Sequence, residues 1–191
     1  MGGIGSGRHW QFGSDATEGY RSIDVRWLKR ERLLFSGISC SVTWSRAGEV
    51  TGSIKVRSEP GRIILDYRHK NGGEDWQDES YPVHLGTTPC HMGGERHWFL
   101  CPALGCGRRV AILYGGAIFA CRHCHRLADR IRDKLGWPGG ILEGGYWGKP
   151  KGMHWRTYER HCAMHDDLLD IGVAGFVQRF GALADRQLGI R

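Results

Sequence analysis

The sequence predicts an α+β fold in which helices flank a small antiparallel β-meander or barrel. Short segments of alternating apolar and polar residues, separated by turn-forming residues, occupy residues 38–101. Such alternation is typical of strands that bury one face. The segments on either side carry apolar residues three or four positions apart, which is the spacing of an amphipathic helix. Strands gathered in one part of the chain favour an α+β fold over an alternating α/β fold.

The composition is that of an ordinary globular protein. The chain has 191 residues, of which 40% are hydrophobic, and this is enough for a sizeable core. Its longest uncharged apolar stretch, residues 110–121, is shorter than the roughly 20 residues of a membrane-spanning helix. Residues 1–14 lack the basic start and apolar run of a secretory signal. We therefore expect a cytoplasmic protein without a membrane span.

The first helix is expected at residues 23–34. Ser22 can cap this helix and Gly37 can end it. Five strands follow, and clusters of glycine, proline and asparagine separate several of them. The strands are expected at residues 38–45, 50–57, 62–69, 81–85 and 97–101.

Beyond these strands the sequence predicts one more hairpin and three helices. Two adjacent glycines form a turn signal between strands at residues 109–114 and 117–121. Leu127, Ile131 and Leu135 then recur every four residues and predict the apolar stripe of a helix. The three helices are expected at residues 123–135, 153–171 and 173–188.

Changes in composition divide the chain into five segments. The first is rich in glycine, the fourth is rich in glycine and basic residues, and the last is helical. The predicted segments are 1–21 (glycine-rich), 22–96 (helix and antiparallel β-domain), 97–135 (cysteine-containing module and following helix), 136–152 (basic loop) and 153–191 (helical region).

Two short-spaced cysteine pairs form the most specific pattern in the chain. Two pairs at this separation are typical of one tetrahedral zinc site. The four predicted ligands are Cys101, Cys106, Cys121 and Cys124. The first pair has a wider gap than many zinc ribbons, and Gly105 makes the tight backbone conformations of such a turn accessible. Four thiolates leave no open coordination position, so we expect one structural Zn²⁺ per chain in a zinc ribbon.

The remaining cysteines are Cys40, Cys90 and Cys162, and they are expected to be free thiols. The chain has seven cysteines in all, and an odd number cannot all pair in disulfides. A reducing cytoplasm therefore suits the chain better than a disulfide framework.

Positive charge is concentrated on and after the predicted ribbon. Residues 101–160 contain eleven Lys and Arg against four Asp and Glu, an excess equal to the whole net charge of +7. Such a surface favours contact with the phosphates of DNA or RNA. Alternatively, the arginines offset the negative charge of a zinc tetrathiolate. The expected nucleic-acid-binding residues are Arg108, Arg109, Arg122, Arg126, Arg130, Lys149, Lys151 and Arg156.

Three histidines form a weaker pattern on the first predicted tail helix. His154, His161 and His165 fall along one side of it, as ligands of a second, nucleolytic metal site would. Surface histidines are the interpretation that the sequence favours, because neither paired carboxylates nor an HExxH motif accompanies them. Nucleotide-binding glycine loops, nucleophile elbows and kinase motifs do not occur in the sequence either.

Several short motifs resemble those of a family of small bacterial zinc-ribbon proteins with no established activity. The resemblance covers most of residues 20–160 and implies the ribbon and a setting in bacterial or mobile-element genomes. After Leu127 the chain departs from the family, which has a longer polar helical segment there. The motifs are residues 88–91 (TPCH), 98–102 (WFLCP), 105–110 (GCGRRV), 119–124 (FACRHC) and 149–156 (KPKGMHWR).

Taken together, these patterns favour a non-catalytic nucleic-acid-binding protein with a structural zinc ion. One alternative is a protein-interaction module, such as an inhibitor or adaptor of a bacterial or phage complex, in which zinc only holds the ribbon together. The other alternative is a metal-dependent nuclease that uses the three histidines. The sequence does not decide between DNA and RNA.

Overall fold

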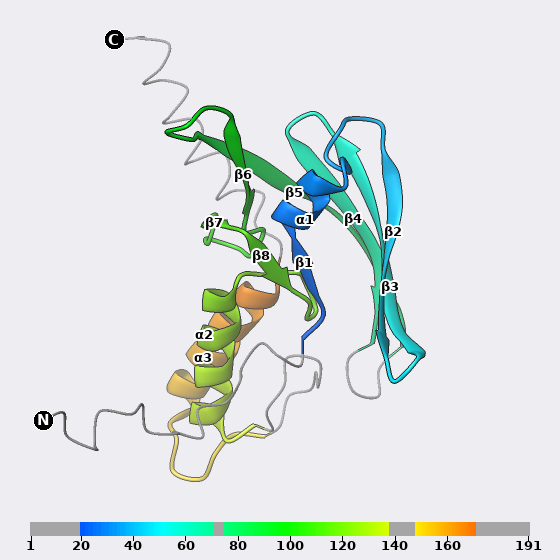
Figure 1. Ribbon diagram of the computed structural model, residues 1–191. Coiled ribbons are helices and arrows are strands. Elements are labelled where there is room, and N and C mark those ends of the chain that lie inside the picture. The colour runs from blue at the N-terminus through cyan, green and yellow to red at the C-terminus, as the bar shows by residue number, and fades with distance from the viewer. Residues whose placement is uncertain (1–19, 71–74, 138–147, 171–191) are drawn as a thin grey trace, which may run out of the picture.

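The computed structural model describes residues 20–70, 75–137 and 148–170, and Figure 1 shows the arrangement of their strands and helices. The α+β class predicted from the sequence is confirmed. In chain order the elements are β1 (Ser22–Asp24), α1 (Val25–Arg30), β2 (Ser39–Arg46), β3 (Glu49–Glu59), β4 (Arg62–His69), β5 (Gln77–Pro89), β6 (Glu95–Leu100), β7 (Arg109–Val110), β8 (Ile112–Tyr114), α2 (Arg122–Leu135) and α3 (Trp155–Leu169).

Strands β2 to β7 form one antiparallel sheet in which each strand lies beside its sequence neighbour. Figure 1 shows that this sheet curls, with β1 and α1 within the curl. Strands β1 and β8 pair with each other as a separate two-stranded sheet. The curl gives the large sheet a concave face, and buried residues of β1, α1 and β8 pack against that face.

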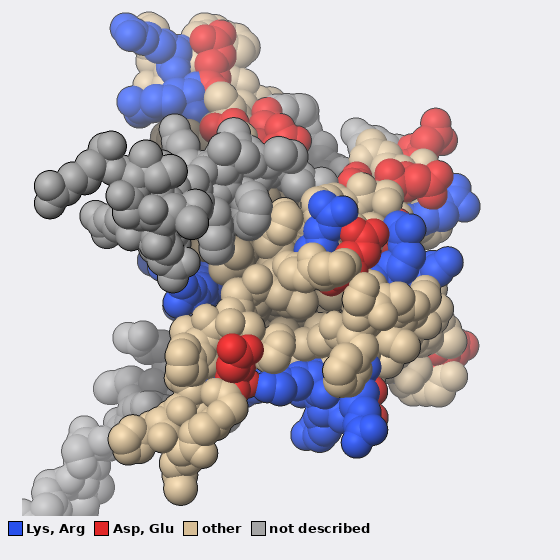
Figure 2. Space-filling view, turned by 90° about the horizontal axis from the view of Figure 1, so that it is seen from above, with Lys and Arg blue, Asp and Glu red and all other residues tan. Residues whose placement is uncertain are grey.

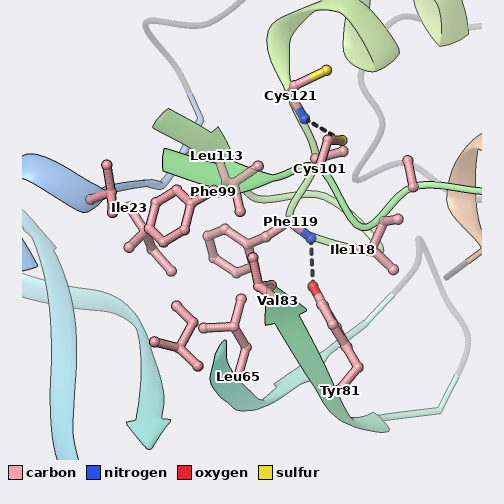
Figure 3. Packing of buried hydrophobic residues seen from close by; sticks show 14 of the residues in the cluster. Ile23, Leu65, Tyr81, Val83, Phe99, Cys101, Leu113, Ile118, Phe119 and Cys121 are labelled. Carbon is pink, nitrogen blue, oxygen red and sulfur yellow. Dashed lines mark hydrogen bonds between the residues drawn. The ribbon is translucent and has the colours of Figure 1, made fainter. Parts of the chain in front are cut away.

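One hydrophobic core fills this curl. Alternate residues of each strand point inward, so that Leu65 of β4 and Val83 of β5 meet Phe99 of β6. Ile23 of β1 and Leu113 of β8 close the same cluster from the other side (Figure 3). The cluster contains residues from both sides of position 97, and β6 spans that position. The sheet and its core thus run through the junction between the second and third predicted segments.

Two tyrosines tie the sheet to the segment before α2. Tyr81 Oη accepts a hydrogen bond from the backbone N–H of Phe119 at 2.7 Å (Figure 3). Tyr67 Oη donates to the carbonyl oxygen of Ala117 at 2.8 Å and lies 3.0 Å from Tyr81 Oη. Burial raises the pKa of both phenols, so both stay protonated in the folded protein.

The N-terminal helix is shorter than the predicted residues 23–34. Ser22 does not cap it but pairs with Tyr114 in the small sheet. Asp24 is the cap, and its carboxylate accepts a hydrogen bond from the N–H of Arg26 at 2.8 Å. The prediction was wrong at this end because pairing with β8 overrides the local helix signal.

The predicted hairpin at residues 109–121 is only partly formed. Its first strand is split: β7 pairs with β6, whereas β8 pairs with β1. Only Tyr114 and Ala120 pair across the turn, through backbone hydrogen bonds of 2.8 and 3.0 Å. The prediction failed because both halves of the first strand have partners elsewhere in the chain.

Helices α2 and α3 lie side by side (Figure 1). They bury Ile131 and Leu135 of α2, with Trp137, against Tyr158 and Leu168 of α3. The bounds of both helices agree with the predicted residues 123–135 and 153–171 to within two residues. The helix predicted at residues 173–188 lies outside the described residues. None of the helices in the described ranges has the length and apolar character needed to span a bilayer.

Candidate metal centre

The four predicted cysteine ligands meet, although they come from two separate stretches of the chain. Cys101 and Cys106 lie in the turn after β6, and Cys121 and Cys124 lie at the start of α2. The four Sγ atoms are all within 4.8 Å of one another. The Sγ–Sγ distance is 3.9 Å between Cys101 and Cys124, 3.7 Å between Cys106 and Cys121, and 3.6 Å between Cys121 and Cys124. This four-cysteine cluster could hold a metal ion.

Backbone hydrogen bonds close the turn that carries the first pair. The N–H of Cys106 donates to the carbonyl oxygen of Ala103 at 3.0 Å, and that of Gly107 donates to Cys101 at 3.2 Å. Gly105 and Gly107 have φ values of 71° and 52°, which glycine adopts without steric cost. These glycines let the chain turn back, so that the widely spaced first pair still delivers both sulfurs to one point.

The N-terminus of α2 positions the second pair. Cys121 is the N-cap residue and Cys124 lies in the first turn. The backbone N–H of Cys121 donates to Cys101 Sγ at 3.2 Å, which joins the two halves of the cluster (Figure 3). The positive end of the helix dipole stabilises thiolates in this first turn.

The thiols of the cluster differ in acidity. The hydrogen bond with Cys101 lowers the pKa of Cys106 to about 7, and it also lowers the pKa of Cys121. Hydrogen bonds with Cys106, Cys121 and Cys124 raise the pKa of Cys101. Four thiolates this close together repel one another, so ionisation of all four requires a bound positive ion.

The protein encloses the cluster on most sides. Cys101, Cys121 and Cys124 are buried and belong to the hydrophobic core of the curled sheet. Cys106 is half-buried. A metal ion bound by four such thiolates has its coordination positions filled by protein, so the arrangement suits a structural ion. The other cysteines, Cys40, Cys90 and Cys162, are free thiols.

The three histidines of the predicted second site do not form a comparable group. Within the described residues, the four cysteines are the only group of three or more candidate ligands this close together. His154 caps α3 by accepting a hydrogen bond from the N–H of Arg156 at 3.2 Å. His161 is half-buried, and His165 is buried with its ring 5.4 Å from that of Trp137. The interpretation as surface histidines is therefore wrong for His165, which α3 packs against the end of α2.

Three of the predicted nucleic-acid-binding arginines lie along the exposed side of α2. Arg122, Arg126 and Arg130 are all exposed, whereas the buried residues of α2 include Ala128 and Ile131 on its other side. No ion pair within the described part of the chain involves any of the three arginines. We call these three residues the α2 arginine stripe.

Arg108 and Arg109 are exposed beside the first cysteine pair. Arg108 follows Cys106 by two residues, and its carbonyl oxygen accepts a hydrogen bond from the N–H of Cys101 at 2.9 Å. Arg109 pairs with Leu100 in the sheet. Both arginines are therefore anchored, through their backbones, to the strand that leads into the metal centre.

The other predicted basic contacts lie around the start of α3. Lys149 Nζ donates to the carbonyl oxygen of Met153 at 2.6 Å and lies 5.4 Å from the centre of the Trp155 ring. These contacts hold the turn that leads into α3. Lys151 and Arg156 are exposed.

The face of the molecule in Figure 2 carries several separate groups of Lys and Arg side chains. Asp and Glu side chains lie between and beside these groups. Charge is therefore mixed on this face.

His125 is a buried residue that the sequence patterns did not single out. Its Nε2 lies 2.9 Å from the carbonyl oxygen of Tyr114, and its ring lies 5.0 Å from that of Tyr20. Burial lowers its pKa, so the ring is neutral near pH 7. The available signal was its position four residues after Cys121 and three before Ala128, which places His125 on the same side of the helix as the buried Cys121.

The four cysteines thus lie together, and the α2 arginine stripe is exposed to solvent. The resemblance to small bacterial zinc-ribbon proteins stays a prediction. No family model, curated protein or solved structure matches the chain.

Proposed function

We propose that this chain is a non-catalytic nucleic-acid-binding protein in which one structural Zn²⁺ holds a zinc ribbon together. The observation that carries the proposal is the α2 arginine stripe, whose members recur every four residues without ion pairs to described carboxylates. The helix that bears them begins at the four-cysteine cluster. A polyanion is the partner that neutralises a row of unpaired guanidinium groups.

The sulfur geometry supports zinc as the metal. In a tetrahedral site with zinc–sulfur bonds of about 2.3 Å, the sulfur atoms are about 3.8 Å apart. Three of the six Sγ–Sγ distances in the cluster, at 3.6 to 3.9 Å, are close to this spacing, and the other three do not exceed 4.8 Å. Iron is the other metal that four sulfurs commonly hold, so metal analysis decides between the two. Reduced thiols of this kind suit a cytoplasmic location.

The spacing of the stripe supports contact with several phosphates. Residues four apart in an α-helix lie about 6 Å apart along its axis. Adjacent arginines can therefore reach different phosphates, and each guanidinium can donate two parallel hydrogen bonds to one of them. Because such contacts do not read base edges, we expect little dependence on base sequence.

The test is a variant in which Arg122, Arg126 and Arg130 are all changed to Gln. Affinity for fluorescent single- and double-stranded DNA and RNA is measured across a salt series. Loss of three phosphate contacts should reduce the steepness of log Kd against log salt by about 2 to 3. Binding at low salt should weaken with every probe.

The matched control changes Arg26, Arg30 and Arg62 to Gln. It removes the same charge from arginines that form ion pairs with Asp24, Glu31 and Glu59, so we expect it to bind almost as the wild type does. Equal affinity and salt dependence in the wild type and the α2 variant would exclude phosphate contact by α2. That result would favour the protein-interaction module.

A further inference from the structure

The six-stranded sheet is open between β3 and β4 over part of their length. Residues 55–59 of β3 pair with residues 62–66 of β4. The earlier part of β3, residues 49–54, pairs with β2 alone, and the end of β4, residues 67–69, pairs with β5 alone. The two strands therefore diverge beyond Lys55.

A cleft of about 670 Å³ lies at this divergence. Pockets that hold small molecules commonly have volumes of roughly 300 to 1,000 Å³. The cleft has an aromatic wall, in which Trp44 stacks on Phe119 at 6.0 Å and Tyr67 meets Phe119 edge-on at 5.3 Å. Trp76 also lines the cleft and is 60% exposed. Arg68 Cζ lies over this ring, 5.8 Å from its centre, and the exposed part of the ring remains available to a ligand.

Positive charge dominates the lining. Asp66 is the one carboxylate among the described lining residues, and it is engaged by Arg57 at 3.5 Å and by Ser80 at 2.5 Å. Arg46 and Lys55 have no ion pair within the described part of the chain. A bound anion would be stabilised by this excess. The four basic residues of the lining are Arg21, Arg46, Lys55 and Arg68, and Arg68 forms an ion pair with Asp78 at 2.8 Å.

Arg21 is held in place at this cleft by three contacts. Its guanidinium donates to the carbonyl oxygen of Thr51, and its own carbonyl oxygen accepts a hydrogen bond from Gly115 at 2.7 Å. The guanidinium lies against Gly52, where a Cβ atom would be 2.6 Å from Arg21 Cζ. Glycine at this position therefore makes room for the arginine, which fixes one charge of the cleft.

His69 adds a buried polar group without a hydrogen bond to any described residue. Its residue is only 8% exposed, it lines the cleft, and neither ring nitrogen has a hydrogen-bond partner among the residues that the structure describes. A carboxylate oxygen of Glu79 is 3.8 Å from Nδ1 and beyond hydrogen-bond distance. An imidazole offers one donor and one acceptor. A ligand with its own donors and acceptors would satisfy both and remove the cost of leaving them unpaired.

We propose that this cleft binds a nucleotide, either free or as one unit of a single strand. The ligand combines a flat ring that packs on Trp76, ring donors and acceptors that meet His69, and a phosphate held by Arg46 and Lys55. The cleft is built from β2, β3, β4 and the segment before α2. It shares no residue with the α2 arginine stripe, so the two proposals can fail separately.

The experiment is calorimetric titration of the metal-loaded full chain with adenosine and uridine monophosphates, inorganic phosphate and a short single-stranded DNA. We expect the mononucleotides to bind more tightly than phosphate alone. Changing both Arg46 and Lys55 to Gln should weaken mononucleotide binding by at least about tenfold, because charged hydrogen bonds are lost. The control with Arg26→Gln and Arg62→Gln removes the same charge elsewhere and should bind as the wild type.

A second pair of variants tests the aromatic contact. Trp76→Ala should weaken mononucleotide binding by about tenfold, because base stacking on the ring is lost. Trp155→Ala changes an equally exposed tryptophan on α3 and should leave mononucleotide binding unchanged.

The oligonucleotide identifies the source of the ligand. Tighter binding of the oligonucleotide than of the mononucleotides indicates a single strand, and equal binding indicates a free nucleotide. The α2 variant should keep mononucleotide binding. Failure of both mononucleotides to bind the wild type, or equal binding by the cleft and control variants, would overturn the proposal.

Discussion

Single side chains hold together the region where the sheet meets the metal centre. The hydroxyl of Tyr81 accepts a hydrogen bond from the N–H of Phe119, two residues before Cys121 of the four-cysteine cluster. Tyr67 continues the chain of hydrogen bonds to Ala117. The position of the second cysteine pair therefore depends on two phenols that belong to strands far away in the sequence.

Replacing Tyr81 with Phe should destabilise the fold by about 1–3 kcal/mol, because the buried N–H of Phe119 loses its acceptor. Urea unfolding of the metal-loaded protein measures this. Tyr114→Phe is the control, since no hydrogen bond of its hydroxyl occurs among the described residues; it should change stability by less than about 0.5 kcal/mol. Equal stability of the two variants would show that the Tyr81 hydroxyl is not needed.

The same phenols predict a loss of stability at high pH. Their pKa values are raised by burial in the folded protein, and Glu79 beside them adds to this shift, while the ring of His69 also faces Tyr67. The unfolded chain releases their protons near pH 10, so it binds fewer protons than the folded chain above that pH. The two phenols should therefore make their full contribution to the unfolding free energy below about pH 10, and this contribution should decrease as the pH rises further.

Unfolding free energies measured between mildly and strongly alkaline pH test this point. Other groups titrate in the same range, so the slope of the wild type is compared with that of a Tyr67→Phe, Tyr81→Phe double variant. A shallower decline in the double variant is expected. Identical slopes would mean that these phenols ionise as easily in the folded protein as in the unfolded chain.

At the scale of elements, α2 joins the metal centre to the helical end of the molecule. Its first turn carries Cys124, and its last turn packs Leu135 with Trp137 against α3. Gly136, with a φ of 64°, ends the helix in the left-handed conformation that favours glycine. The two ends of α2 thus belong to different buried clusters, and Leu168 of α3 packs against both.

Replacing Leu135 with Ala should cost about 2–5 kcal/mol, because it removes a fully buried side chain and leaves a cavity. Hydrogen exchange should then show faster exchange of amides in α3, while the metal content stays that of the wild type. Lys134→Ala, an exposed neighbour, is the control and should leave exchange unchanged. Loss of metal from the Leu135 variant would contradict the separation of the two ends.

The sequence could predict the elements whose signals are local. The spacing of Leu127, Ile131 and Leu135 located α2, and strand alternation located most of the sheet. Residues 77–80 and 86–89 of β5 were missed, because they are polar or interrupted by glycine and become strands only by pairing with β4 and β6. Ser22 failed as a cap for the same reason.

The candidate sites likewise include one part that the sequence could predict and one part that it could not. The cysteine pairs could be found because each pair and the gap between the pairs have fixed lengths in the sequence. The cleft between β3 and β4 could not, since it depends on where two strands stop pairing. His69, Trp44 and Lys55 come together there only through the register of the sheet.

For the whole molecule, the four-cysteine cluster and the sheet share one core. Cys101, Cys121 and Cys124 belong to the same buried cluster as Leu65 and Val83. A metal bound at the cysteines should therefore stabilise the sheet as well as the turn that carries the ligands.

Removal of the metal with a chelator under reducing conditions should lower the temperature of unfolding of the whole sheet. Circular dichroism of strand and helix signals should show both shifting together by several degrees, because metal binding free energy is part of the folding free energy. Readdition of Zn²⁺ should restore the original transition. A sheet that melts at the same temperature with and without metal would mean that the cysteine cluster is energetically independent.

The proposed function is tested most directly by the salt dependence of nucleic-acid binding by the wild-type chain, with metal content determined on the same sample. We predict one zinc per chain and a Kd that rises steeply with salt, with a slope that corresponds to at least about three phosphate contacts. One zinc per chain without binding to DNA or RNA at low salt would contradict it.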